Sequence, residues 1–336
     1  MRVADWIAEY LHSIGVRRVH GLMGGGAAGL NDGFIKHPGI EYICYHHEQG
    51  AGHAALGEAK YTGKLAVVNP TTGCAGTNCS TSVLNGYQDG VPVLFLSGNV
   101  RLDNTAHWVN ERSNVKIRHY GVQEHDIVST MKSITKYSKF VTTPDDVAAS
   151  LFEAVQWAIH GRPGPVWVDI PANVQVAEMP EVRTTFMPFD WVGKLKEKSS
   201  LIDIIDFSKR PLIIAGMGIR QAGCVNQFMQ FVQKYQIPFV TTYGAQDYAP
   251  HDHPLNIGAV GVRGTRFGNF AMQNADLLLI IGTSLGSSVI GYDPKQFNNH
   301  AYKVYIDIDK SELDKEIIPV DKKIQIPLTE FFREML

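Results

Sequence analysis

The sequence lacks the features that mark membrane, zinc or nucleic-acid-binding proteins. No apolar run approaches the roughly 18 residues needed to cross a bilayer. The four cysteines, Cys44, Cys74, Cys79 and Cys224, show no metal-ligand spacing, so we predict no metal site and a reduced, cytoplasmic protein. A formal net charge of −2 gives no reason to expect nucleic acid or an anionic membrane as a partner. Residues 1–16 are amphipathic and include acids, so we expect neither a signal nor a transit peptide.

What is present indicates a large α/β protein. The 336 residues are 44% hydrophobic and 19% charged, which is typical of a globular chain long enough for two domains. Short apolar strands alternate with amphipathic helices in both halves, which predicts two doubly wound parallel-sheet domains. We assign residues 1–176 to the first domain and residues 208–336 to the second. Residues 177–207 contain Pro180, Pro188 and a charged run, so we predict a linker there.

The first domain is organised around residues 42–78. An apolar strand at 42–45 is followed by a helix that opens at Glu48, a second strand at 65–69 and a glycine–threonine loop. A carboxylate where a strand ends and a helix begins is well placed for chemistry. The alternative is that Glu48 only interacts favourably with the helix macrodipole. The helix has several small residues that allow close packing: Gly50, Ala51, Gly52, Ala54, Ala55, Gly57 and Ala59.

A glycine run precedes this core. Residues 16–20 predict a strand that leads into Gly24, Gly25 and Gly26 and then into a helix. Glycine permits close approach of the backbone to a ligand, so the run is a candidate ligand-binding loop. A plain tight turn explains the same residues equally well.

Taken in order, these segments resemble the amino-terminal pyrimidine-binding domain of thiamine-diphosphate (ThDP) enzymes, in the acetolactate synthase and benzoylformate decarboxylase branch. The resemblance rests on Glu48, on the turn at 61–64, and on Thr71-Thr72-Gly73 followed by Asn78. It implies that Glu48 is the catalytic residue that holds N1′ of the aminopyrimidine. It also implies that loop residues bind the pyrimidine side of the cofactor: Gly24, Gly25, Thr72, Gly73 and Asn78. Asn78 could instead cap the next helix.

The chain departs from the common family pattern at four positions. Cys74 and Ala75 stand where proline and glycine are usual, and Asn99 and Asn173 replace glutamine and aspartate. Because proline and glycine fix loop backbone, we expect a different loop geometry and different substrate handling. Residues 101–125 are polar and irregular, and we expect them to fold over the site.

The second domain resembles the family's middle domain, which holds FAD in some members. Its Gly216–Gly223 turn is off the dinucleotide fingerprint by two residues, which argues against an unrelated NAD-type oxidoreductase. In the FAD-holding members, Arg162 and Arg263 would each face the flavin pyrophosphate. Both could equally be surface arginines.

The family's Gly-Asp-Gly motif, which binds Mg²⁺ and the diphosphate, does not occur in these 336 residues. We therefore expect the diphosphate-binding domain to be absent here and to come from a longer protein or a separate chain. The predicted function is the amino-terminal portion of a homo-oligomeric ThDP-dependent lyase or carboligase that acts on a 2-oxo acid. The alternative is a non-catalytic nucleotide- or cofactor-binding regulator built on the same two domains.

Overall fold

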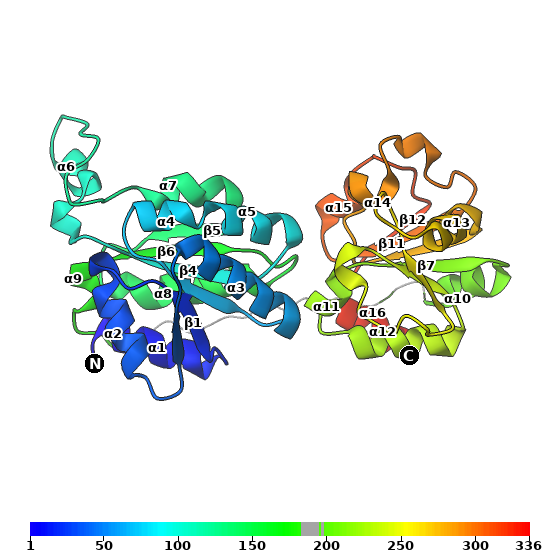
Figure 1. Ribbon diagram of the computed structural model, residues 1–336, viewed down its shortest axis with the longest axis horizontal. Helices are drawn as coiled ribbons and strands as arrows, with labels where there is room; N and C mark the ends of the chain where they lie inside the picture. Colours follow the sequence, from blue (N-terminus) through cyan, green and yellow to red (C-terminus); the bar gives the residue numbers. More distant parts are fainter. Residues whose placement is uncertain (183–194, 196–197) are drawn as a thin grey trace. The chain divides into compact units, whose positions relative to one another are not determined.

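The computed structural model describes residues 1–182, 195 and 198–336, and it divides the chain into two compact units, Met1–Phe189 and Asp190–Leu336 (Figure 1). Each unit contains one six-stranded sheet in which every strand pair is parallel. The predicted α/β class with two parallel-sheet domains is confirmed.

The sheet of the first unit has the strand order β2-β1-β3-β4-β6-β5. Its strands are β1 (Arg18–Gly21), β2 (Glu41–Cys44), β3 (Ala66–Asn69), β4 (Val93–Asn99), β5 (Tyr137–Phe140) and β6 (Val166–Pro171). Every residue of β3, β4 and β6 is buried, as expected for a parallel sheet that is covered on both faces. The longer helices are α1 (Val3–Ser13), α2 (Ala28–Lys36), α3 (Glu48–Thr62), α5 (Ser80–Asp89) and α8 (Asp145–Ile159).

Alternating side chains of the strands divide this core into two layers. In β4, Leu94 and Leu96 pack with α1, α2 and α8, whereas Phe95 packs with α3 and α5 on the opposite face. This alternation is the period of two that a strand imposes on its side chains. The small residues Ala51, Ala55 and Ala59 let α3 approach the sheet closely.

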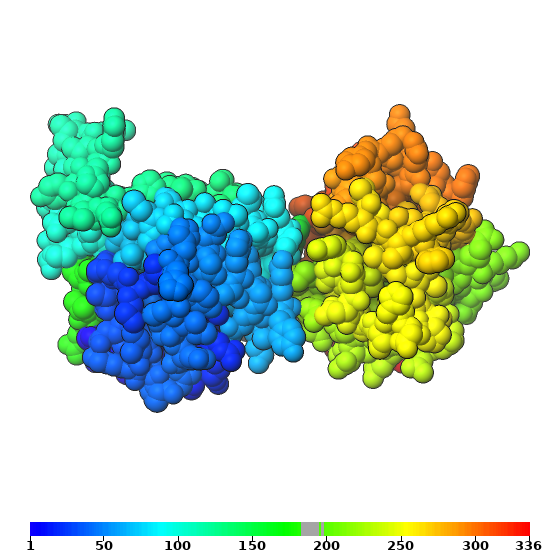
Figure 2. All heavy atoms as spheres, in the orientation of Figure 1, coloured from blue at the N-terminus to red at the C-terminus, as the bar shows by residue number. Residues whose placement is uncertain are grey.

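The described part of the first unit also contains four short α-helices: α4 (Cys74–Asn78), α6 (Ala106–Arg112), α7 (Ile127–Met131) and α9 (Ala172–Gln175). The segment that contains α6, drawn in cyan-green in Figure 2, protrudes from the body of this unit. Its base is held by Glu124, whose Oε1 accepts hydrogen bonds from the amides of Ala106 (3.1 Å) and Tyr120 (3.0 Å).

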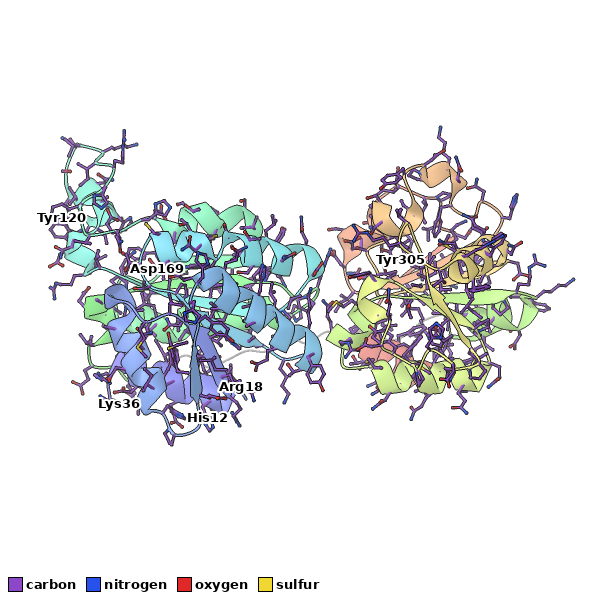
Figure 3. The ribbon with its side chains drawn as sticks, viewed as in Figure 1. His12, Arg18, Lys36, Tyr120, Asp169 and Tyr305 are labelled. Carbon is purple, nitrogen blue, oxygen red and sulfur yellow. The ribbon has the colours of Figure 1, made fainter. Side chains whose placement is uncertain are left out.

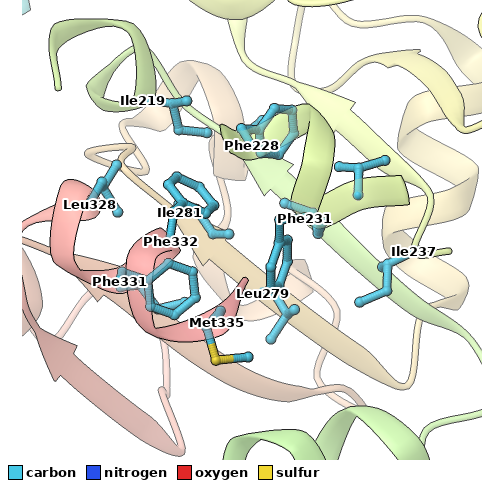
Figure 4. Close-up of a cluster of buried hydrophobic side chains, with 14 of the residues drawn as sticks. Ile219, Phe228, Phe231, Ile237, Leu279, Ile281, Leu328, Phe331, Phe332 and Met335 are labelled. Atoms are coloured by element: carbon cyan, nitrogen blue, oxygen red, sulfur yellow. The ribbon is translucent and has the colours of Figure 1, made fainter. Parts of the chain in front are cut away.

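The sheet of the second unit has the order β12-β11-β10-β7-β8-β9. Its strands are β7 (Pro211–Ala215), β8 (Phe239–Thr241), β9 (Asn256–Ala259), β10 (Leu277–Ile281), β11 (Tyr302–Asp307) and β12 (Lys322–Gln325). Its helices are α10 (Lys198–Phe207), α11 (Gly218–Gln221), α12 (Val225–Tyr235), α13 (Arg266–Asn274), α14 (Ser287–Ile290), α15 (Lys310–Asp314) and α16 (Leu328–Met335). Aromatic rings of α12 and α16 pack on β10; the centroids of Phe231 and Phe332 lie 5.8 Å apart (Figure 4).

The predicted linker at 177–207 is too long at its end, because its last ten residues form helix α10. Lys198–Phe207 is helical, and Leu201 and Ile205 are buried in the same core as α12. The charged run beside this segment concealed its helical spacing of apolar residues. Other parts of the predicted linker, including Pro188, lie outside the described residues.

Replacing Leu201 with alanine should lower the free energy of unfolding of the second unit by about 2–3 kcal/mol, because a buried side chain would leave a cavity. Urea denaturation followed by circular dichroism measures the change. Phe207, on the same helix, is 86% exposed, so Phe207→Ala should change that free energy by less than about 0.5 kcal/mol. Equal effects of the two substitutions would contradict the packing of α10.

Candidate functional site

The candidate site lies at the carboxyl edge of the first sheet, where β1, β3 and β4 end. These strands are neighbours in the sheet, so the loops that follow them meet at one edge. A Cβ atom added at Gly26 would lie 1.6 Å from Thr72 Oγ1, and one added at Gly98 would lie 2.1 Å from the Gly26 carbonyl oxygen. The loops therefore touch at distances that only glycine allows.

Gly98→Ala should destabilise the first unit by about 2 kcal/mol or more, because the new methyl group would meet backbone that cannot rotate away. The matched control is Gly50→Ala in α3, where an added Cβ meets nothing within 4 Å. That control should be neutral or stabilise the protein by up to about 1 kcal/mol, because alanine is favoured inside helices. Thermal unfolding of both variants tests the pair. Equal melting temperatures would refute the close contact of the loops.

Glu48 is the first residue of α3, and the preceding His47 caps the helix by accepting the Gln49 amide at 3.2 Å. Only 7% of Glu48 is exposed, which is unusual for an acid whose sole role is to balance a helix dipole. Its Oε2 accepts a hydrogen bond of 3.0 Å from Nδ2 of Asn78, which ends α4. Cys79, not Asn78, occupies the N-cap position of α5. The structure thus brings two of the predicted site residues together.

The loop between β3 and α4 carries two buried hydroxyl groups without partners. Oγ1 of Thr71 and Oγ1 of Thr72 are buried, and neither has a hydrogen-bond partner among the described residues. Buried polar atoms are almost always paired, so these two hydroxyl groups are candidates for bonding a ligand. Gly73 has a left-handed backbone (φ 55°), and a Cβ atom there would lie 1.7 Å from the Gln123 carbonyl oxygen. The segment after α6 therefore reaches this loop.

The two predicted glycines differ in their surroundings. A Cβ atom added at Gly24 would lie 2.4 Å from Cγ2 of Thr71, so this glycine packs directly on the threonine loop. Gly25 is exposed, and an added Cβ would meet nothing within 4 Å. The donor set of one buried carboxyl, one amide and unpaired hydroxyls fits an aminopyrimidine, which offers ring nitrogens and an amino group.

Asn99 faces the interior of the unit rather than the open edge. Its Nδ2 donates to Oδ2 of Asp169 at 2.7 Å, and the Ser97 hydroxyl donates to Oδ1 of the same carboxyl at 2.5 Å. Asp169 is 1% exposed and lies deep in the unit (Figure 3). Burial raises the pKa of the Asp169 carboxyl to about 7, although the hydrogen bonds from Ser97 and Asn99 act to lower it. Sequence analysis missed this carboxyl.

Asn173, the other amide that departs from the family pattern, holds the start of the 101–125 segment. Its Oδ1 accepts the Leu102 amide at 2.8 Å. Gln175 follows on the same short helix, is fully buried and bonds to the glycine run at the Gly26 carbonyl oxygen (2.7 Å). Neither contact was predictable from the local sequence, because each joins segments more than seventy residues apart in the chain.

The two arginines predicted to face a flavin lie in different units. Arg162 donates from Nη2 to the Gln88 carbonyl oxygen at 2.8 Å. Arg162 precedes β6 and Gln88 precedes β4, so Arg162 lies at the amino edge of the first sheet, opposite the edge that carries Glu48. Arg263 is exposed in the loop that follows β9. Flavin binding through these residues stays a prediction.

Among the described residues, no group of three His, Cys, Asp or Glu side chains is arranged to hold a metal ion. No helix in this described part of the chain has both the length and the apolar character needed to cross a membrane. All four cysteines are free thiols.

Comparison with known proteins identifies two matching family models. The thiamine pyrophosphate enzyme N-terminal TPP binding domain matches residues 1–152, and the thiamine pyrophosphate enzyme central domain matches residues 199–335.

The acetolactate synthase large subunit of Lactococcus lactis subsp. lactis (strain IL1403) is 33% identical over 327 residues, covering 96% of this chain and 54% of the relative. The corresponding subunit of Corynebacterium glutamicum is 31% identical over 349 residues, covering 100% and 52%. Isozyme 1 of Escherichia coli (strain K12) is 30% identical over 315 residues, covering 93% and 53%. The chain thus spans about half the length of these curated relatives.

Proposed function

Because this chain belongs to the thiamine pyrophosphate enzyme family, we propose that it forms the pyrimidine-binding and central parts of an acetolactate-synthase-like lyase or carboligase. The observation that carries the proposal is the buried Glu48 carboxyl, bonded by Asn78 at 3.0 Å, in a unit whose threonine loop holds unpaired hydroxyl groups. This combination offers both a proton-exchanging group and free hydrogen-bonding capacity for a heterocycle.

Each of these residues has a separate task in the proposal. Asn78 occupies Oε2 of Glu48, and no described residue bonds Oε1, so Oε1 is the oxygen that would exchange a proton with a ring nitrogen of the cofactor. The Thr72 hydroxyl, which has no hydrogen-bond partner among the described residues, would bond the amino group of the same ring. Burial of Glu48 excludes water from the proton exchange. When bound, ThDP supplies the electron sink for bond cleavage and formation beside a carbonyl.

The remaining parts of the active site are proposed from the family. Mg²⁺ and the diphosphate would be held by a domain with the Gly-Asp-Gly motif, either elsewhere in a longer protein or on a separate chain. The substrate would be a 2-oxo acid, and the working form would be a homo-oligomer. A cytoplasmic location accords with four free cysteines.

Flavin binding to the second unit is a finer part of the proposal. Arg263 is exposed in the loop after β9, at the carboxyl edge of the sheet, where ligands of open α/β sheets gather. A guanidinium at this edge suits a pyrophosphate group.

Calorimetric titration with ThDP and Mg²⁺ tests the proposal. The chain is titrated alone and then together with the part of the protein, or the neighbouring chain, that carries the Gly-Asp-Gly motif. We expect tight binding in the complete assembly, followed by carboligation of 2-oxo acids. No ThDP binding in the complete assembly would refute the proposal. Flavin binding without turnover in that assembly would instead support the alternative function, a non-catalytic nucleotide- or cofactor-binding regulator.

A further inference from the structure

One buried amide side chain holds the backbone of the glycine run at the site. The run continues as a 3-10 turn, η1 (Gly25–Ala27), and then as α2. Gln175, at the end of α9, is 0% exposed and reaches this run from a point 149 residues further along the chain. Its Nε2 donates to the Gly26 carbonyl oxygen (2.7 Å) and to the Ile170 carbonyl oxygen (2.7 Å). Its Oε1 accepts the Leu30 amide at 3.2 Å.

These contacts use both donors and the acceptor of the amide group. Two backbone carbonyl groups require donors and one backbone N–H group requires an acceptor, and a glutamine side chain supplies all three from one position. A Cβ atom added at Gly29 would lie 2.8 Å from Cβ of Gln175, so the absence of a side chain at Gly29 makes room for the contact. The amide of Gly24, nearer the start of the run, is bonded separately by Oδ1 of Asn31 at 3.3 Å.

Gln175 is linked to the unpaired hydroxyl group of Thr72 through a single residue. Its partner Gly26 is the residue whose α-carbon faces Thr72, since an added Cβ would lie 1.6 Å from Thr72 Oγ1. A shift of Gly26 would therefore change the space in front of this hydroxyl. Thr72 is 5% exposed, and no hydrogen bond from a described residue holds its Oγ1 in place.

We propose that Gln175 is a positioning residue of the cofactor site, which sets the place of Gly26 and of the start of α2 and thereby the space beside the Thr72 hydroxyl. This inference rests on the proposed function, because it assumes that ThDP occupies that space. Gln175 itself is fully buried and would not touch the cofactor.

The test uses Gln175→Met, which keeps an unbranched side chain of similar length and removes all three hydrogen bonds. The control is Asn298→Leu in the second unit. Asn298 is 1% exposed, and its side chain also bonds only backbone. It donates to the carbonyl oxygens of Met272 (2.6 Å) and Ala275 (3.0 Å) and accepts the amides of His300 (3.1 Å) and Ala301 (2.9 Å). Both variants lose a buried amide side chain, but only Gln175→Met loses one that bonds the glycine run.

The first measurement is hydrogen–deuterium exchange of the full protein without cofactor. In Gln175→Met, exchange within residues 24–31 should rise by about tenfold, the equivalent of one lost buried hydrogen bond, while β3 and β4 keep their protection. In Asn298→Leu, residues 24–31 should exchange as in the wild type. Unchanged exchange in this segment of Gln175→Met, or an equal rise throughout the first unit, would overturn the proposal.

The second measurement is ThDP binding by the same variants in the complete assembly. Gln175→Met should raise the dissociation constant for ThDP by about tenfold, with kcat at saturating ThDP close to that of the wild type, because only the alignment of the loop has changed. Wild-type affinity in this variant would overturn the positioning role while leaving the proposed function intact. Failure of the wild-type assembly to bind ThDP would instead overturn the proposed function, and this inference with it. If Gln175→Met does not fold, Gly29→Ala, whose added Cβ would lie 2.8 Å from Cβ of Gln175 and displace the same amide, should show the same loss of affinity.

Discussion

Replacing Glu48 with glutamine is expected to lower kcat of the complete assembly by at least about 100-fold, because an amide of the same size cannot exchange a proton with the cofactor ring. The fold should survive, since glutamine retains an oxygen that can accept the hydrogen bond from Asn78. Steady-state turnover of a 2-oxo acid at saturating ThDP measures the effect. Far-ultraviolet circular dichroism of the isolated chain reports on the fold.

The matched control is Glu58→Gln, which makes the same chemical change on the same helix. Glu58 Oε2 lies at hydrogen-bond distance, 2.8 Å, from His20 Nε2, and glutamine can also bond that nitrogen. This variant should retain most of the wild-type turnover. Retention of more than about one-tenth of turnover in Glu48→Gln would remove Glu48 from the mechanism, whatever the effect of the control.

Asp169→Asn should remove a pH-dependent contribution to the free energy of unfolding. This contribution is as large as about 4 kcal/mol, because each unit of pKa shift corresponds to about 1.4 kcal/mol. Burial raises the pKa of the Asp169 carboxyl to about 7 from its ordinary 3.8, so the folded state favours the protonated form. This stabilising contribution is complete below about pH 4 and is lost as the pH rises through about 7. Asparagine is neutral throughout, so the variant should gain stability relative to the wild type across that interval.

Urea denaturation between pH 4 and pH 8, followed by tryptophan fluorescence, measures this difference. The control is Asp103→Asn in the same unit, an exposed carboxyl paired with Arg101, whose removal should leave stability almost unchanged at every pH because water screens exposed ion pairs. A difference between wild type and Asp169→Asn that stays constant with pH, or that changes in favour of the wild type as the pH rises, would contradict the raised pKa.

The sequence alone was sufficient for the fold class, and it singled out Glu48 and Asn78, which the structure places in contact. Apolar runs of four to seven residues, separated by amphipathic helices, predicted two parallel sheets because the pattern of each element is local. Three edge strands, β5, β9 and β12, were missed because their positions are half-exposed and do not form apolar runs. Helix α10 was missed because charged neighbours diluted the signal of Leu201 and Ile205.

Only the tertiary structure decided which polar groups meet. The bond between Glu48 and Asn78, the unpaired hydroxyl of Thr72 and the burial of Asp169 all depend on loops that meet when parallel strands align their carboxyl ends. The contact of Gln175 with Gly26 spans 149 residues. Local patterns reveal which residues can form a strand or a turn, because those preferences act over a few bonds. The pairing of a buried donor with its acceptor is set by the packing of the whole unit, so it becomes visible only in three dimensions.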